Sequence, residues 1–249
     1  MTLDFIANPP QNFTWQNSNN LRYINQESQN CVSPKFASEV DLALQSMGET
    51  SKKIIDAKGL HIQLCQKLSD IVPEYKAETP RGWPEGSTWD NACAVSRDGV
   101  VIFAENAIPF GDKHSVFNSG IARHEFGHEF DKRYGEDARF ADVDDYVKNY
   151  LADIKNFPNN FEKYKQMIDY NNNKPVQRQL DYIIQGSTSK KSSCGGRYES
   201  FAEMFAKLNG GSQGKVQMHP NFDKFTDITF PKVTECVQDL LKKFLAGKL

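Results

Sequence analysis

Apolar residues near the start of the chain recur first at the spacing of a helix and then at the spacing of a strand. Residues 34–57 carry apolar side chains three or four positions apart, and these predict one amphipathic helix: Phe36, Val40, Leu44 and Met47. Ser33-Pro34 suits the start of that helix, and Gly59 suits its end. Residues 60–64 then alternate apolar and polar positions, which predicts a half-buried strand.

Two further apolar runs, 92–96 and 100–105, flank an Asp-Gly pair, which is typical of a β-hairpin. From about Ser115 onward the periodicity is helical, and Pro158 is one of the expected breaks. The predicted helices there cover 115–133, 138–156, 159–171, 175–185, 197–208 and 231–245. A small sheet followed by many helices predicts an α+β fold.

The length and charge of the chain narrow the class of protein to which it can belong. With 249 residues, 39% of them hydrophobic, it can form one large domain or two small ones. Residues 1–33 are polar and rich in Asn and Gln, so we expect an N-terminal arm or cap on a single domain over 34–249. A net charge of −2 gives no reason to expect nucleic acid as a partner. No apolar run approaches the roughly 20 residues of a membrane span, and the start of the chain lacks a secretory signal, so a soluble protein is expected.

The segment HEFGH, residues 124–128, is an HExxH motif inside a predicted helix. His124 and His128 are one turn apart on one face, which lets two imidazoles bind one tetrahedral Zn²⁺. Glu125 lies beside them and can take a proton from the attacking water and return it to a leaving amine. The opposite face carries Ala122, Phe126 and Phe130, so the helix can pack into a core.

The third zinc ligand has to come from elsewhere, because Asp131 and Tyr134 stand where a metzincin has Gly and His. The best candidate is Glu199 in the predicted helix 197–208, which would complete a His₂Glu site. Glu203, one turn on, or Asp131 could accept a hydrogen bond from a ligand imidazole. The other ligand candidates lie outside helix 197–208: His114, His219 or an aspartate of another type of HExxH hydrolase, namely Asp142, Asp144 or Asp145.

Three segments together resemble the anthrax lethal factor-like zinc metalloproteases, a group related in fold to the Pro-Pro endopeptidases: HEFGHEFD, GRYESFAEMFA and PRGWPEGSTWDN. The resemblance covers roughly residues 80–244. It implies a zincin-like fold, a Zn²⁺ cofactor held by His124, His128 and Glu199, and Glu125 as the catalytic base. It also implies that strand 100–105 pairs with a protein substrate in extended form.

The resemblance further implies a tyrosine in the loop before the third ligand. This tyrosine stabilises the oxyanion that develops on the substrate. That loop, residues 190–196, holds no tyrosine. Tyr198 is the nearest substitute and is the predicted catalytic residue, and Tyr182 is the more distant alternative. The expected function is a zinc-dependent endopeptidase acting on a protein, and a catalytically inactive zinc-binding interaction module is the rival.

The family resemblance also suggests a toxin or effector that acts on a host protein. The five cysteines are scattered and form no CxxC pair, which argues against a disulfide framework and predicts mostly reduced, buried thiols. Reduced thiols are consistent with a protein that acts in a host cytosol. The protein would reach that cytosol by a route other than the general secretory pathway.

Overall fold

The computed structural model describes residues 31–80, 83, 85–97, 99–111, 116–132, 139–167, 180–185, 195–212 and 221–248. The chain divides into two compact units, Met1–Glu129 and Phe130–Leu249, and each is described by itself. A single domain over 34–249 therefore stays a prediction. Most of the expected N-terminal arm, together with His114, His219 and residues 190–194, lies outside the described residues.

The first unit begins with two helices where the sequence predicts one. Helix α2 (Pro34–Ser46) starts as expected, because the Ser33 side chain accepts a hydrogen bond from Phe36 N at 3.1 Å. It ends where Met47 adopts an extended conformation, and α3 (Glu49–Lys58) restarts after Gly48. Met47 is buried at 1% exposure, so the break lets its side chain enter the core. Gly59 ends α3 in the left-handed conformation that glycine permits, as predicted.

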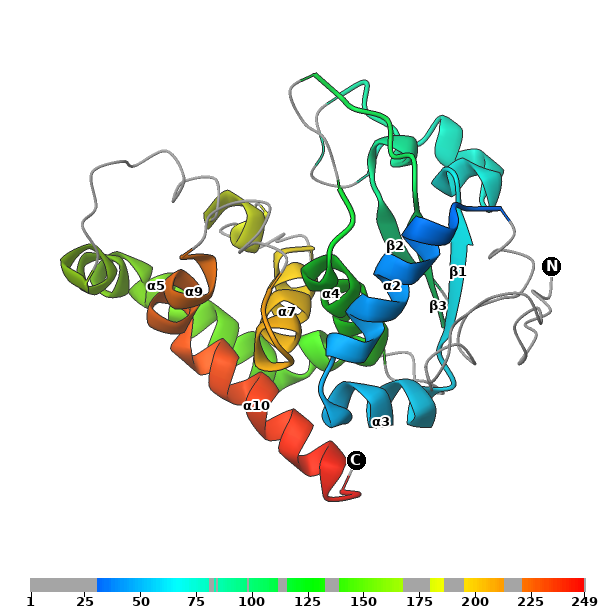
Figure 1. Ribbon diagram of the computed structural model, residues 1–249. Helices are drawn as coiled ribbons and strands as arrows, with labels where there is room; N and C mark the ends of the chain where they lie inside the picture. The colour runs from blue at the N-terminus through cyan, green and yellow to red at the C-terminus, as the bar shows by residue number, and fades with distance from the viewer. Residues whose placement is uncertain are drawn as a thin grey trace. The chain divides into compact units, whose positions relative to one another are not determined.

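A three-stranded sheet follows, in the order β1-β3-β2 (Figure 1). The predicted hairpin is confirmed, since β2 (Ala94–Arg97) pairs antiparallel with β3 (Val100–Ala104). Strand β1 (His61–Cys65) pairs parallel with β3. The expectation that β1 is half-buried is wrong: Ile62, Gln63 and Leu64 are all buried, because both faces of the strand are covered.

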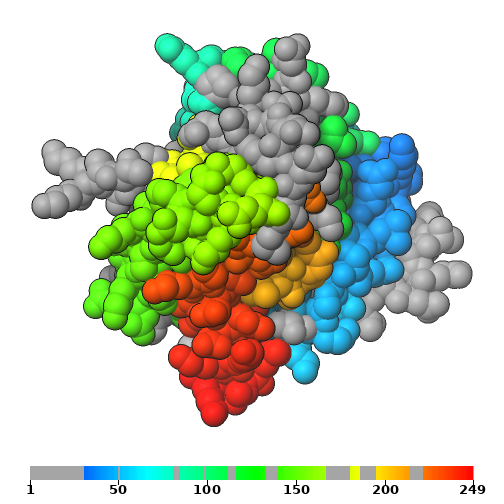
Figure 2. Space-filling model, turned by 90° about the vertical axis from the view of Figure 1, so that its left-hand side faces the viewer, coloured from blue at the N-terminus to red at the C-terminus, as the bar shows by residue number. Residues whose placement is uncertain are grey.

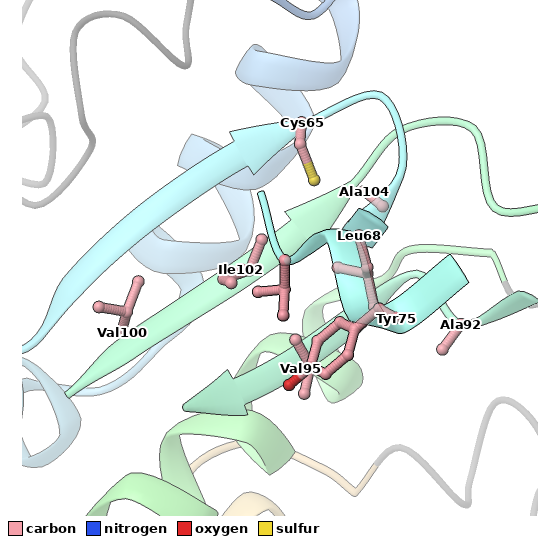
Figure 3. Close-up of a cluster of buried hydrophobic side chains, with 9 residues drawn as sticks. Cys65, Leu68, Tyr75, Ala92, Val95, Val100, Ile102 and Ala104 are labelled. Atoms are coloured by element: carbon pink, nitrogen blue, oxygen red, sulfur yellow. The ribbon is translucent and has the colours of Figure 1, made fainter. Parts of the chain in front are cut away.

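One face of the sheet carries an apolar cluster that joins the strands to the loops around them (Figure 3). Val95, Val100 and Ile102 contribute from the strands, and Leu68 and Tyr75 contribute from short 3₁₀ helices. The Tyr75 ring stacks on Trp89 with centroids 4.9 Å apart. This cluster fixes the hairpin in the first unit.

Helix α4 (Ser119–Asp131) contains the HExxH motif, and the division between the units falls near its end. The described part of the second unit is mainly helical. After a 3₁₀ helix (Phe140–Asp142) it contains α5 (Asp144–Met167), a short helix over 180–184, α7 (Gly195–Leu208), α9 (Phe222–Thr229) and α10 (Pro231–Leu245). Helix α10 packs against α5 and α9 (Figure 2), and its bounds match the sequence prediction.

One prediction for this unit is wrong, and one helix was missed. Pro158 does not separate two helices, because α5 runs straight through it. Proline removes one backbone hydrogen bond, but Phe157 and Phe161 on either side are packed against aromatic neighbours, and this packing offsets the loss. Helix α9 was not predicted, although Phe222, Phe225 and Thr229 have a helical spacing and are fully buried.

The part of the chain that the structure describes is a helix-rich α+β fold with one small sheet, as predicted. Within the described ranges no helix is long and apolar enough to cross a membrane. Four of the five cysteines fall within these ranges and are free thiols: Cys31, Cys65, Cys93 and Cys236. Burial raises the pKa of the Cys65 thiol, which keeps it protonated and unreactive.

Candidate metal site

Helix α4 places its two histidines side by side. Asn118 caps its start, because its side chain accepts a hydrogen bond from Ile121 N at 3.1 Å and its carbonyl accepts one from Ala122 N. The ring centroids of His124 and His128 lie 4.6 Å apart with their planes nearly perpendicular. His124 is buried and His128 is half-buried. This is the arrangement that the HExxH spacing predicts for two ligands of one metal ion.

The rest of α4 is anchored on its other faces. Ala122 and Phe126 are fully buried, as the sequence predicts for the face opposite the histidines. Glu129 is also fully buried, and its carboxylate accepts a hydrogen bond from Gly99 N at 2.9 Å, in the turn between β2 and β3. Sequence reasoning missed this contact, because nothing local links residue 129 to residue 99. Glu125 is half-buried.

Glu199 lies near the start of α7 and is half-buried. Its Oε2 atom accepts a hydrogen bond of 2.7 Å from the hydroxyl of Tyr182. His124, His128 and Glu199 form a group of side chains that could hold a metal ion. Among the third-ligand candidates that fall within the described residues, Glu199 is the one in this group, and its role as third ligand stays a prediction.

Tyr198, the predicted oxyanion donor, has a different partner. Its hydroxyl donates to Asp142 Oδ2 at 2.7 Å, and the Arg139 guanidinium lies 4.3 Å from the centre of its ring. The other oxygen of Asp142 accepts a hydrogen bond of 2.6 Å from Arg197. Asp142 therefore binds the two residues that precede Glu199 in α7.

The remaining acidic candidates also have defined surroundings. Asp144 and Asp145 are exposed in the first turn of α5, where carboxylates stabilise a helix. Asp131 is fully buried and accepts hydrogen bonds from Ala141 N at 2.8 Å and from Arg139 at 3.2 Å. Its carboxylate therefore holds the turn that leads into α5. Glu203 is buried on α7, and its pairing with a ligand imidazole stays a prediction.

These features define a helix-rich α+β protein with a candidate His₂Glu metal site. No protein-family model matches the sequence, and no curated protein matches it. Among solved structures, a Pro-Pro endopeptidase from Paenibacillus alvei is similar over 84% of this chain and 92% of that chain, at 19% identity and a TM-score of 0.48. A similarity at this level does not show the activity of this chain, which has to be argued from its own residues.

Proposed function

We propose that the protein is a zinc-dependent endopeptidase in which His124, His128 and Glu199 hold the metal and Glu125 is the general base. The observation that carries this proposal is the His, His, Glu group itself, with two histidines one turn apart on α4. Two imidazoles and one carboxylate are the donor set of a hydrolytic zinc with an open fourth position. The side chains present therefore fit a zinc ion.

The packing of the last turn of α4 supports this ligand set. Phe130 lies two residues after His128, and it contacts Phe201 and Phe205 of α7 with ring centroids 6.2 and 5.5 Å apart. Phe201 in turn lies two residues after Glu199. Because a helix is rigid over two residues, this aromatic contact within the second unit ties the segment after His128 to the segment after Glu199.

Different side chains carry out the separate steps of peptide hydrolysis. A zinc ion, when bound, would polarise the scissile carbonyl and make water more acidic. Glu125 accepts the proton of the attacking water and delivers it to the leaving amine nitrogen as the bond to the carbonyl carbon breaks. The bond from Tyr198 to Asp142 supports a structural role for Tyr198, so its hydroxyl is a weak candidate for the oxyanion donor.

A protein bound as an extended strand remains the proposed substrate, but the implied docking on residues 100–105 requires correction. β3 is the central strand, and its backbone groups already bond to β1 and β2. Within the described part of the chain, β2 is an edge strand next to β3, and its outer edge is the position that we propose for the substrate. Cys93 pairs with Ala104 through a hydrogen bond, and bonded pairs alternate along antiparallel strands, so Ala94 and Ser96 direct their backbone N–H and C=O groups outward.

A role as a toxin or effector acting on a host protein stays a prediction that depends on the family resemblance. An aspartate as third ligand is less favoured, because both oxygens of Asp142 bind residues of α7. The proposal accordingly stops at endopeptidase chemistry on a protein substrate.

The experiment that tests this function compares wild type with Glu125→Gln and His128→Ala. We expect wild type and Glu125→Gln to bind one Zn²⁺ per chain and His128→Ala to lose it, because two remaining ligands hold zinc poorly. Each protein is then incubated with a cell lysate, and new N-termini are sequenced. We expect wild type to generate them, Glu125→Gln to generate them slower by about 10²-fold or more, and His128→Ala to generate none.

Each other outcome has a definite meaning. Zinc bound without new N-termini in any lysate would favour an inactive zinc-binding module. Full zinc occupancy in His128→Ala would refute the assigned ligands. New N-termini produced equally well by Glu125→Gln would remove Glu125 from the mechanism.

A further inference from the structure

The residues around Tyr182 are held against the start of α7, where Glu199 follows the first turn. We propose that Tyr182 is a positioning residue that fixes the carboxylate of Glu199 in the orientation in which it binds the metal. This inference rests on the proposed function for its metal. It assigns to Tyr182 a role that acts through Glu199 and needs no contact with the substrate.

The direct contact is the hydrogen bond of 2.7 Å from the Tyr182 hydroxyl to Glu199 Oε2. Hydrogen bonds from a hydroxyl to a carboxylate are short and about twice as strong as bonds between neutral groups. A glutamate side chain has several rotatable bonds, and ordering it costs conformational entropy. A carboxylate already oriented by Tyr182 therefore loses less freedom when it binds a metal ion.

The backbone on both sides of Tyr182 is itself fixed. Ile183 is fully buried, and its carbonyl accepts a hydrogen bond of 2.8 Å from the hydroxyl of Tyr150 on α5. A Cβ atom added to Gly196 of α7 would lie 2.6 Å from that same carbonyl oxygen and 2.4 Å from the carbonyl oxygen of Ile184. Only glycine allows this approach, so segment 180–185 and the first turn of α7 are in direct backbone contact.

Asp142 holds the same turn of α7 through the two residues before Glu199. Its ion pair with Arg197 and its hydrogen bond from Tyr198 restrain the backbone, whereas Tyr182 restrains the Glu199 side chain. The two tyrosines thus form a natural pair for comparison. Each donates one hydroxyl hydrogen bond of 2.7 Å to a carboxylate, but only Tyr182 donates to Glu199.

The test measures zinc affinity of the full chain by competition with a chromophoric chelator. The variants are Tyr182→Phe, Glu199→Ala and the double variant, with Tyr198→Phe as the matched control. We expect Tyr182→Phe to raise the Kd for Zn²⁺ by about 10- to 100-fold, the usual effect of removing a group that orients a metal ligand. Tyr198→Phe should stay within about threefold of wild type.

The double variant separates positioning from a general loss of structure. If Tyr182 acts through Glu199, removing its hydroxyl has no further effect once Glu199 is alanine, so the double variant should bind zinc as Glu199→Ala does. Additive losses would instead show that Tyr182 supports the fold, and would overturn the proposal. The far-ultraviolet circular dichroism of the metal-free proteins checks that each variant is folded.

Two other results would also overturn the inference. They differ in whether the ligand set of the proposed function remains valid. If Glu199→Ala weakens zinc binding and Tyr182→Phe does not, the proposed ligands stand and the positioning role fails. A loss of kcat in Tyr182→Phe with unchanged Kd for Zn²⁺ would then place its hydroxyl at the reacting carbonyl. If Glu199→Ala itself leaves the Kd unchanged, the ligand set of the proposed function is wrong as well.

Discussion

At the scale of single residues, Gly196 shows how little room the start of α7 has. A Cβ added there would meet two backbone carbonyl oxygens and the Tyr150 hydroxyl at 2.4 to 2.6 Å. Backbone atoms cannot move aside as the end of a flexible side chain can. The position therefore requires glycine although the residue lies in a helix, where alanine is intrinsically better by about 1 kcal/mol.

We therefore expect Gly196→Ala to lower the free energy of unfolding by about 1–3 kcal/mol, the usual cost of overpacking. The change should also weaken zinc binding, because it pushes the first turn of α7 away from Tyr182. Urea unfolding monitored by circular dichroism measures the first effect. Gly48→Ala is the control, since nothing lies within 4 Å of an added Cβ there; equal unfolding curves for the two variants would contradict the expectation.

At the scale of elements, the sheet decides which strand can receive a substrate. β3 has neighbours on both sides, so the outer edge of β2 is the position proposed for strand addition. The alternation of hydrogen bonds along β2 assigns the N–H of Ser96 to that edge and the N–H of Val95 to the pairing with Ile102. Proline lacks an N–H, so it distinguishes the two positions.

We expect Ser96→Pro to fold normally and to cleave a peptide found in the lysate experiment about 5- to 10-fold less efficiently in kcat/KM, as for the loss of one hydrogen bond of about 1–1.4 kcal/mol. Ser96→Ala keeps the N–H and should cleave like wild type. Val95→Pro removes a bond within the sheet, so thermal unfolding should begin at a lower temperature. Unchanged kcat/KM in Ser96→Pro would exclude this edge as the substrate site.

At the scale of the whole molecule, one buried carboxylate links stability to pH. Asp153 of α5 is 1% exposed and accepts a hydrogen bond of 2.9 Å from Val233 N, at the start of α10. Burial raises the pKa of this carboxyl from 3.8 to about 6. The folded protein therefore binds this proton more tightly than the unfolded chain does.

The sign of the effect follows from that difference. The stabilising contribution of protonated Asp153 is fully present below about pH 4 and is lost as pH rises to about 6, at up to about 1.4 kcal/mol per pH unit. Asp153→Asn cannot titrate, so the gap between its free energy of unfolding and that of wild type should change across this window and be constant above it. Urea unfolding at steps between pH 4 and 7 measures the gap. A constant gap throughout would mean that Asp153 has an ordinary pKa.

The sequence by itself determined the features that depend on neighbours along the chain. The capped start of α2, the end of α3 at Gly59 and the β2–β3 hairpin follow from local spacing and backbone preference, and the structure confirms them. The side-by-side placement of His124 and His128 on α4 also follows from local spacing, and their role as metal ligands stays a prediction. The start of α10 at Pro231 belongs to the same group. Each involves residues within one or two turns, where periodicity and glycine or proline chemistry act directly.

Tertiary structure decided the features that depend on residues far apart in the chain. Aromatic packing carries α5 through Pro158, against the local preference of proline. The pairing of β1 with β3 makes β3 the central strand and leaves β2 as an edge strand among the described residues. Contacts made by Asp142 and Gly196 direct the Tyr198 hydroxyl away from Glu199 and the Tyr182 hydroxyl toward it. No local pattern holds this information, because each choice is set by which distant surface offers burial and a hydrogen-bond partner.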